Sequence, residues 1–362
     1  MTPPPRSAPD GYLWRPITAA DLERWTVLLA AIEAVDQEDE HVGVEELTEF
    51  LDHPNIDFPR GTTAAFDTAG AGEMVAYGML QVRDEADPEH LLWVTGAVHP
   101  GHRRRGLGNR LLDWAKQAAV PLHEERFPDR PMSLVGNVAV KLADALALFE
   151  RHGYQPSRWF NGMAVDLTSP DLPSGLAPGG PAPEPPDGVV FVPFTAERSA
   201  DALRVRNESF VDHWGSTATS TEAWAHRIAS AVFRPGFTYL AYERTSGGDA
   251  AGQGEPLALV LGEEYEIHQR ATGKRDLHIA LVGTLRAARG RGIATALLTD
   301  VLRRARDAGF DSASLGVDSD SPTGATRLYG RIGFEVQDTV VAQLLPVVTG
   351  PGTGNSRPTD AL

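Results

Sequence analysis

Two short segments carry the same arrangement of arginine and glycine, and each lies between an apolar, strand-like stretch and an apolar, helix-like one. The first is Gly101–Gly108 (GHRRRGLG), the second is Arg289–Ala294 (RGRGIA), and both contain the pattern RxxGxG/A. At a helix start, free backbone N–H groups and the positive dipole end meet, and glycine lets a phosphate come close. Arginine adds charge-assisted hydrogen bonds. The pattern predicts two pyrophosphate-binding turns. The alternative is that glycine only avoids backbone strain in a tight strand–helix turn and that the arginines are solvated.

Other phosphate and metal motifs fit the chain less well. Leu107 stands where a Walker A motif requires lysine, and Leu111 stands where the dinucleotide fingerprint requires its third glycine. The chain has no cysteine, which excludes a thiol nucleophile, a disulfide scaffold and a Cys-ligated zinc or iron–sulfur site. It also has no HExxH motif. We therefore predict that the protein binds no metal.

The elements that must position these turns occur in the same order in both halves of the chain. Hydrophobic periodicity and turn residues predict, in the first half, a strand from 12, helices 20–34 and 43–53, strands 61–67, 73–85 and 91–100, a helix from 106, a strand 131–140 and a helix 143–152. In the second half they predict a strand 189–195, helices 196–210 and 219–230, strands 237–243, 256–267 and 277–285, a helix from 292, a strand 312–318, a helix 322–332 and a strand 334–347.

The repeat has a nearly constant offset. Arg103 and Arg289 are 186 positions apart, as are Gly106 and Gly292, and the helix-ending glycines Gly153 and Gly333 are 180 apart. Such an offset over several elements indicates duplication. We predict an α+β fold (three layers, α/β/α) of two tandem units, each a mixed, mainly antiparallel twisted sheet flanked by helices.

Composition sets the expected boundaries of the two units. Residues 168–187 contain seven prolines and three glycines, which predicts an extended, semi-rigid linker. The expected domains are therefore 11–167 and 188–348, and residues 1–10 and 349–362 are expected to be disordered.

Charge and length limit the classes of partner. The 362 residues suit two domains, and 33 basic against 49 acidic side chains give a net charge of −16. This charge disfavours non-specific binding to nucleic acid or to an anionic membrane. No apolar run is long enough to span a bilayer, and the start of the chain lacks the order of a signal peptide. We expect a cytoplasmic protein, monomeric or homodimeric, that binds a cationic or neutral small molecule.

The helix after the second turn is followed by a strand and by a helix that ends in LYxxxGF, from Leu328 to Phe334. This order of motifs, present in both halves, resembles the GNAT superfamily of acetyl-CoA-dependent N-acetyltransferases, in a tandem arrangement of the mycothiol-synthase type. The resemblance covers nearly the whole chain outside the linker and the tails. It implies that acetyl-CoA is the co-substrate and that the arginine–glycine turns hold its pyrophosphate.

The resemblance also implies that the end of the preceding strand offers main-chain groups to the pantetheine and the acetyl carbonyl. The implied coenzyme-binding residues of the first unit are Gly96, Ala97, Val98, Arg103, Arg104, Arg105, Gly106, Leu107 and Gly108. Those of the second unit are Val282, Gly283, Thr284, Arg289, Gly290, Arg291, Gly292, Ile293 and Ala294.

Acetylation of an amine needs a neutral amine, a donor to the developing oxyanion and an acid for the departing thiolate. The resemblance places Tyr329 at the position of the general acid, and the same position in the first unit is Phe149, which has no proton to give. The alternative role of Tyr329 is a core aromatic that packs a helix end.

A candidate base lies on the strand before the second turn. By alternation His278, Ala280, Val282 and Thr284 share one face, and an imidazole with a pKa near 6.5 can take a proton from an ammonium. Counting back six residues from Val98, as from Thr284, gives Leu92 in the first unit. We therefore expect the second unit to catalyse and the first to be structural, or to bind acetyl-CoA without turnover.

Alternatives to this base remain open. His278 also suits a strand histidine bonded to backbone, and GNAT enzymes often carry a glutamate on this strand instead. Glu263, Glu264 and Glu266 on the preceding predicted strand are rival bases. Candidate contacts to the acceptor are Glu264 and the segment Asp212, His213 and Trp214, which equally suits an N-cap beside core aromatics.

The leading hypothesis is acetyl transfer to a primary amine of a small molecule by direct attack on the thioester. The alternatives are a protein N-acetyltransferase and a non-catalytic acyl-CoA-binding sensor or immunity protein.

Overall fold

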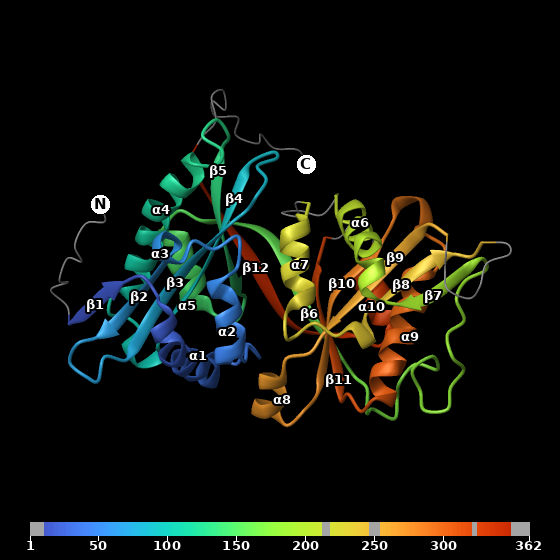
Figure 1. The fold of residues 1–362 in the computed structure, drawn as a ribbon. Helices are drawn as coiled ribbons and strands as arrows, with labels where there is room; N and C mark the ends of the chain where they lie inside the picture. The colour runs from blue at the N-terminus through green and yellow to red at the C-terminus, as the bar shows by residue number, and fades with distance from the viewer. Residues whose placement is uncertain (1–10, 212–217, 246–253, 321–323, 349–362) are drawn as a thin grey trace, which may run out of the picture. The chain divides into compact units, whose positions relative to one another are not determined.

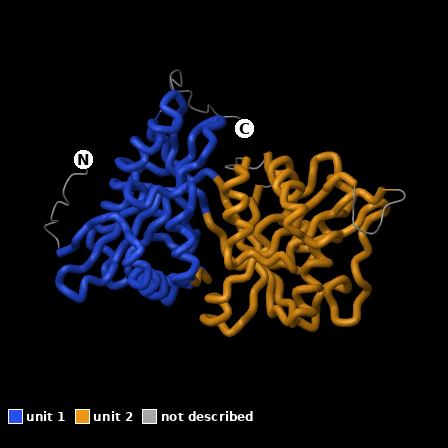
Figure 2. The backbone as a smooth tube through the Cα atoms, viewed as in Figure 1, with its two compact units in different colours: residues 1–38, 42–157, 341–362 blue, residues 39–41, 158–340 orange. Residues whose placement is uncertain are grey.

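The computed structural model describes residues 11–211, 218–245, 254–320 and 324–348. The contacts divide the chain into two compact units (Figure 2). Unit 1 contains residues 1–38, 42–157 and 341–362, and unit 2 contains residues 39–41 and 158–340. The termini that were expected to be disordered, 1–10 and 349–362, lie outside the described residues. Within the described ranges, none of the helices has both the length and the apolar composition needed to cross a membrane.

Unit 1 has a sheet with the strand order β1-β2-β3-β4-β5-β12, in which β4 and β5 are parallel and the pairs from β1 to β4 are antiparallel (Figure 1). The strands are β1 (Tyr12–Arg15), β2 (Thr62–Asp67), β3 (Met74–Val82), β4 (His90–Val98), β5 (Met132–Ala139) and the second half of β12 (Glu335–Val348). The helices are α1 (Leu22–Asp36), α2 (Val44–Leu51), α3 (Phe58–Gly61), α4 (Leu107–Glu124) and α5 (Ala143–Arg151).

Unit 2 repeats this plan with the strand order β7-β8-β9-β10-β11-β6-β12, and here β10 and β11 are the parallel pair. The strands are β6 (Gln155–Asp166), β7 (Val189–Pro193), β8 (Tyr239–Glu243), β9 (Pro256–Glu263), β10 (Asp276–Thr284) and β11 (Ser312–Asp318). The helices are α6 (Ser199–Ser209), α7 (Thr221–Ala229), α8 (Glu266–Thr272), α9 (Ile293–Asp307) and α10 (Ala325–Ile332).

Both faces of the second sheet are covered because its central strand is apolar on both sides. On β9, Ala258 and Val260 pack in the core that includes α9 and α10, whereas Leu259 and Leu261 pack in the core with α6 and α7. Alternating side chains point to opposite faces of a strand, so a strand that is apolar throughout needs helices on both sides. The predicted α+β fold with mixed, helix-flanked sheets is confirmed.

The last strand of each repeat lies in the sheet of the other unit. β6, which the sequence analysis missed, ends the first repeat but pairs antiparallel with β11 in unit 2, from Asp166 opposite Ser312 to Phe160 opposite Asp318. Residues 341–348 of β12 close the second repeat but belong to unit 1, where β12 follows β5 in the strand order. The two compact units therefore differ from the two sequence repeats, 11–167 and 188–348.

The proline-rich linker is anchored to the core of unit 2 by apolar side chains. Leu176 is 1% exposed and lies in the core of unit 2, with Leu172 packed against the same core. The Arg306 guanidinium donates a hydrogen bond to the Leu176 carbonyl. The prediction of an extended linker overlooked this leucine, because proline content dominates the composition around it.

Candidate active site

The second arginine–glycine turn connects β10 to α9 in a backbone conformation that glycine favours. Gly290 and Gly292 have φ angles of 79° and 77°, in the left-handed region, and a Cβ built on either would meet no atom within 4 Å. Within the described residues no side chain caps the start of α9, which leaves its first N–H groups available to a ligand. Arg289 donates from Nε to the Thr284 carbonyl (3.3 Å) and from Nη2 to the Ser209 carbonyl (3.1 Å), which ties the turn to β10 and α6.

The first turn has the same backbone conformation but carries internal ion pairs. Its left-handed residues are Arg104 (φ 61°) and Gly106 (φ 85°), and Arg103 donates from Nε to the Val98 carbonyl (3.1 Å). The rest of the Arg103 guanidinium makes a two-point contact with the Asp36 carboxylate at 2.8 and 2.6 Å, and Arg104 pairs with Asp144. Protein carboxylates thus neutralise two of the arginines that a pyrophosphate would need in unit 1.

In unit 2 the two central parallel strands stop pairing before either of them ends. β10 and β11 pair from Asp276 opposite Ser312 to His278 opposite Ser314, although β10 continues to Thr284 and β11 to Asp318. The β9–β10 register also shifts between Ile279 and Leu281, which marks a bulge. In unit 1 the β4–β5 pairing runs on to Val94 opposite Gly136, and β4 pairs with β3 without a bulge.

The bulge corrects the expected alternation along β10. Ala280 packs with the core on the α6 and α7 side, whereas Val282 packs with the core on the α9 side. The extra residue shifts the alternation by one position, so His278, Ala280, Val282 and Thr284 do not share one face. The prediction that they do was wrong.

The bulge also changes the counterpart of His278 in unit 1. Leu277 and Leu92 are both buried in the core beside the long helix that follows the turn, α9 in unit 2 and α4 in unit 1. The strand position after each leucine is therefore equivalent, and His278 corresponds to Trp93 rather than to Leu92. Neither Trp93 nor Leu92 can act as a base, so the asymmetry between the units remains.

His278 is partly buried and is held by a side chain of the neighbouring strand. Its Nδ1 lies 3.1 Å from Ser314 Oγ, and the Tyr265 ring lies edge-on with its centroid 6.2 Å away. Desolvation lowers the pKa of His278, and the charge of Arg227 adds to this, while Glu263 and Asp276 act in the opposite direction. A lowered pKa keeps the imidazole neutral at neutral pH, as a proton acceptor must be.

Tyr329 lies on α10 in the core on the α9 side, so it and His278 approach the sheet from opposite faces. Its ring packs edge-on against Phe334, and desolvation raises the pKa of Tyr329 to about 12. Its hydroxyl donates to none of the described residues. In unit 1 the Phe149 ring lies so close to Gly136 that a Cβ there would overlap it. The counterpart of the tyrosine is therefore an apolar side chain that fills the end of the β4–β5 pairing.

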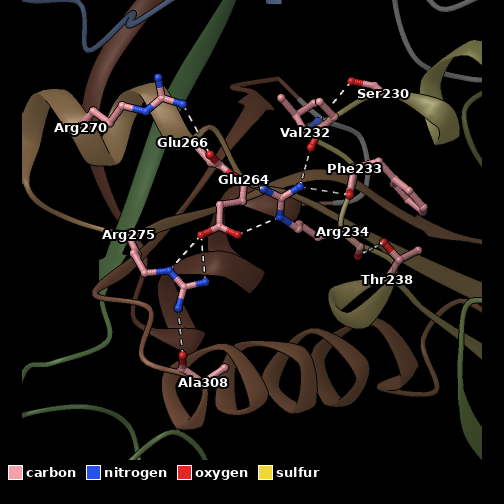
Figure 3. A network of polar contacts seen from close by, with 11 residues as sticks. Ser230, Val232, Phe233, Arg234, Thr238, Glu264, Glu266, Arg270, Arg275 and Ala308 are labelled. Atoms are coloured by element: carbon pink, nitrogen blue, oxygen red, sulfur yellow. Dashed lines mark hydrogen bonds and ion pairs between the residues drawn. The ribbon is translucent and has the colours of Figure 1, made fainter. Parts of the chain in front are cut away.

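The three glutamates considered as rival bases are held in ion pairs. Glu264 accepts from Arg234 Nε at 2.8 Å and from Arg275 Nε at 2.9 Å, as Figure 3 shows, and these arginines lower its pKa against the desolvation that raises it. Glu263 accepts from Arg227 at 2.8 Å and from the Tyr265 hydroxyl at 3.1 Å.

The position of Glu266 differs from the sequence expectation. It lies not on a strand but at the start of α8, a helix that the sequence analysis missed, and it pairs with Arg234 and Arg270. Both carboxylate oxygens of Glu264 are occupied by arginine, so Glu264 is bonded as a structural ion pair.

The expected coenzyme-binding residues occupy the end of the strand and the turn in each unit. In unit 2, Val282, Gly283 and Thr284 end β10, and Arg289 to Ala294 form the turn and the start of α9. The Thr284 hydroxyl is buried with no hydrogen-bond partner among the described residues, which leaves a polar group available to a ligand. In unit 1, Gly96, Ala97 and Val98 end β4, and Arg105 donates to the Tyr12 hydroxyl at 3.3 Å.

Two further predictions concern the acceptor and metals. Asp212, His213 and Trp214 lie outside the described residues. Asp39, His41 and His268 bring possible metal-ligand atoms within 4.8 Å of one another, a grouping that the sequence did not reveal because the residues are far apart in the chain. The absence of a metal stays a prediction.

Comparison with known proteins places this geometry in a family. The profile of the Acetyltransferase (GNAT) family matches residues 203–334, and the profile of the Acetyltransferase (GNAT) domain matches residues 63–156. A mycothiol acetyltransferase from Parafrankia sp. (strain EAN1pec) is 30% identical over 329 residues, which cover 88% of this chain and 93% of that protein. Another from Rhodococcus erythropolis is 27% identical and covers 76% of this chain and 82% of that protein.

Solved structures agree with this assignment. A GCN5-related N-acetyltransferase from Sphaerobacter thermophilus matches with a TM-score of 0.71 at 27% identity and covers 95% of this chain and 98% of that one. A tandem GNAT protein from the clavulanic acid biosynthesis pathway shares the fold, with a TM-score of 0.68 at 17% identity, over 94% of this chain and all of that one. The chain belongs to the GNAT family of acetyltransferases and carries two GNAT domains in tandem.

Proposed function

We propose that unit 2 transfers an acetyl group from acetyl-CoA to a primary amine of a small molecule. The observation that carries this proposal is that two side chains with proton-transfer chemistry lie on opposite faces of one sheet: His278 where β10 and β11 stop pairing, and Tyr329 in the core on the α9 side. The open, glycine-lined start of α9 lies at the end of the same strand. Unit 1 shares the open, glycine-lined start of the helix, but it has neither proton-transfer side chain, and its β4–β5 pairing extends further.

In this proposal some residues of unit 2 bind the coenzyme and others transfer protons. The N–H groups at the start of α9, with Arg289 and Arg291, would hold the coenzyme pyrophosphate, and the unpaired end of β10 would bind the chain that carries the thioester. The neutral His278 imidazole would accept a proton from the ammonium of the acceptor. The Tyr329 phenol, kept protonated by its raised pKa, would donate its proton to the departing thiolate.

The sheet face that carries His278 is open further along β11. Alternation places Ser314 and Gly316 on the same face, and Gly316 is exposed, with no atom within 4 Å of the position of a Cβ. An amine approaching from this side would reach the imidazole before the unpaired end of β10. The relatives named mycothiol acetyltransferase support a small molecule as the acceptor.

We propose that unit 1 does not catalyse. Its turn arginines pair with Asp36 and Asp144, and Phe149 replaces the acid. Its strand position equivalent to His278 is Trp93. The two replaced side chains remove the proton donor and the proton acceptor, and the two carboxylates offset part of the charge of the turn.

The test is an assay of thiol release from acetyl-CoA with a panel of amines, which should include the unacetylated form of mycothiol, amino sugars and peptides with free N-termini. We expect release with at least one small amine and none with peptides. His278→Gln should reduce this turnover, whereas Trp93→Phe in unit 1, the matched control, should leave it unchanged. Tight coenzyme binding with no thiol release against any amine would contradict the proposal and favour a sensor, and release with peptides alone would favour a protein acetyltransferase.

A further inference from the structure

A short chain of hydrogen bonds connects His278 to a carboxylate on its own strand. Ser314 Oγ lies 2.6 Å from Asp276 Oδ2, and Ser312 Oγ lies 2.6 Å from Asp276 Oδ1. His278 Nδ1 lies 3.1 Å from the same Ser314 Oγ. Asp276 and His278 are two residues apart on β10, and Ser312 and Ser314 are two residues apart on β11, so all four share one face of the sheet.

The direction of each hydrogen bond follows from the number of protons available. A serine hydroxyl has one proton, and an ionised carboxylate can only accept. At 2.6 Å from Asp276 the Ser314 hydroxyl must donate to the carboxylate, because otherwise two unprotonated oxygens would face each other at that distance. Ser314 Oγ can then only accept from the ring, so His278 carries its proton on Nδ1.

We propose that Asp276, acting through Ser314, is a positioning residue that holds His278 in the Nδ1–H tautomer and leaves Nε2 as the atom that accepts a proton. Nε2 has no hydrogen-bond partner among the described residues, so its lone pair is available. Ser314 has no contact with a substrate in this role; it orients the ring. The proposal deepens the proposed function, on which its catalytic part rests.

The proton balance of the step is simple. Nε2 forms an N–H bond as the ammonium N–H bond of the acceptor breaks, and the acceptor amine keeps the electron pair. The imidazolium that results still donates from Nδ1 to Ser314, and Asp276 offsets its charge through the hydroxyl. The charged groups that act on the ring are Glu263 at the end of β9, Asp276 on β10 and Arg227 on α7, and the proton later leaves Nε2 to water.

The chain supplies a matched pair of variants. Ser314→Ala removes the acceptor from Nδ1, whereas Ser312→Ala removes a hydrogen bond of the same length to the same carboxylate without any contact with His278. Ser314→Thr keeps the hydroxyl and should restore the wild-type behaviour. Any loss that came only from a weakened β10–β11 contact would therefore occur in both alanine variants.

The deciding measurement is nitrogen NMR of the full-length protein labelled at histidine, with the His278 signal assigned from its loss in His278→Gln. We expect the Nδ1–H tautomer in the wild type, in Ser312→Ala and in Ser314→Thr, and a mixture of tautomers in Ser314→Ala. A wild-type ring protonated on Nε2, or an unchanged tautomer in Ser314→Ala, would overturn the proposal.

The kinetic measurement separates this proposal from the proposed function. Ser314→Ala should lower kcat/KM on the order of 10-fold, with most of the loss in kcat, and Ser312→Ala should change it much less. If His278→Gln leaves turnover intact, the proposed role of His278 fails while the NMR result still decides the tautomer. If His278→Gln abolishes turnover but Ser314→Ala matches Ser312→Ala in rate, the positioning role fails alone.

Discussion

At the level of single residues, the two units differ in what their equivalent side chains can do with a proton. Tyr329 and Phe149 occupy the same position at the end of a helix, and both are packed in a core. Only the tyrosine has a hydroxyl, and burial raises its pKa to about 12, so it stays protonated at any physiological pH. Such a group cannot act as a base at neutral pH, but it can give a proton to a thiolate that forms beside it.

We expect Tyr329→Phe to lower kcat roughly 100-fold, the lower end of what a general acid contributes, with little change in coenzyme affinity. Steady-state kinetics and a coenzyme titration measure the two effects. Tyr239→Phe is the matched control, since Tyr239 is another buried tyrosine of the same core. A wild-type kcat in Tyr329→Phe would remove the phenol from the mechanism.

At the level of elements, the two strand–turn–helix segments share one backbone conformation. Both turns place two residues in the left-handed region, at 104 and 106 in unit 1 and at 290 and 292 in unit 2. Unit 2 has glycine at both positions, whereas unit 1 has Arg104 at the first, and the arginine before it, Arg103, pairs with Asp36. The two turns therefore share one backbone conformation, and carboxylates offset part of the arginine charge of the turn in unit 1.

A pair of glycine substitutions uses this equivalence. Gly292→Ala and Gly106→Ala each force a Cβ into a left-handed position, at a similar cost of about 1 kcal/mol in stability. We expect Gly292→Ala to raise the KM for acetyl-CoA by about 10-fold, because its methyl group also enters the space for the pyrophosphate. Gly106→Ala should leave the KM unchanged. Equal effects of the two substitutions on the KM would show that both turns serve the reaction.

The sequence predicted the elements that have strong periodicity or a motif. The α4 and α9 helices, the strands before them and both turns are where the pattern placed them, because alternating or helical spacing of apolar residues directly reflects burial. β6 was missed because only Met163 and Val165 among its twelve residues are buried, which leaves a weak pattern, and α8 was missed because it is short. The bulge at Ala280 has no signal in a single sequence, so the faces of Val282 and Thr284 were assigned wrongly. Ser314 and Asp276 were not noticed because their relation to His278 depends on strand register.

At the level of the whole molecule, stability also depends on buried groups of unit 1. His90 at the start of β4 and His123 near the end of α4 are fully buried, with their Nδ1 atoms 2.8 Å apart. His90 Nε2 donates to the Arg83 carbonyl at 3.0 Å, so a neutral His90 must accept at Nδ1 from His123. Desolvation lowers the pKa of His90 to about 4 and also lowers the pKa of His123.

This pair predicts acid sensitivity of unit 1. Because the folded pKa of His90 is below the ordinary value near 6.5, the unfolded chain binds the proton first, and stability that is present above pH 6.5 is lost as the pH falls towards 4. At about 1.4 kcal/mol per pKa unit the loss from His90 alone is roughly 3 kcal/mol. Thermal unfolding between pH 7.5 and 4.5 measures it. His90→Gln should start less stable but decline less steeply, and parallel declines of the two proteins would contradict the assignment.

The exchange of final strands predicts what happens when the backbone is cleaved between the two repeats. A protease site inserted within residues 181–187 would sever the backbone between the repeats without removing any strand. Because β6 pairs in unit 2 and the second half of β12 lies in unit 1, we expect the two fragments to remain together in native gel filtration and to separate only in denaturant. Separation of the fragments in native buffer would show that the exchanged strands do not hold them.

The exchange of β6 also predicts that the first repeat, for which we propose no catalytic role, cannot be removed without damage to its neighbour. Residues 160–166 of β6 pair with β11, the strand on which Ser314 lies. A protein trimmed to the second repeat would lack β6 and would expose the backbone amides and carbonyls of β11. Such an unpaired strand edge promotes aggregation. Anyone who engineers a minimal enzyme from this chain must therefore graft a substitute for residues 158–166 before altering the chemistry.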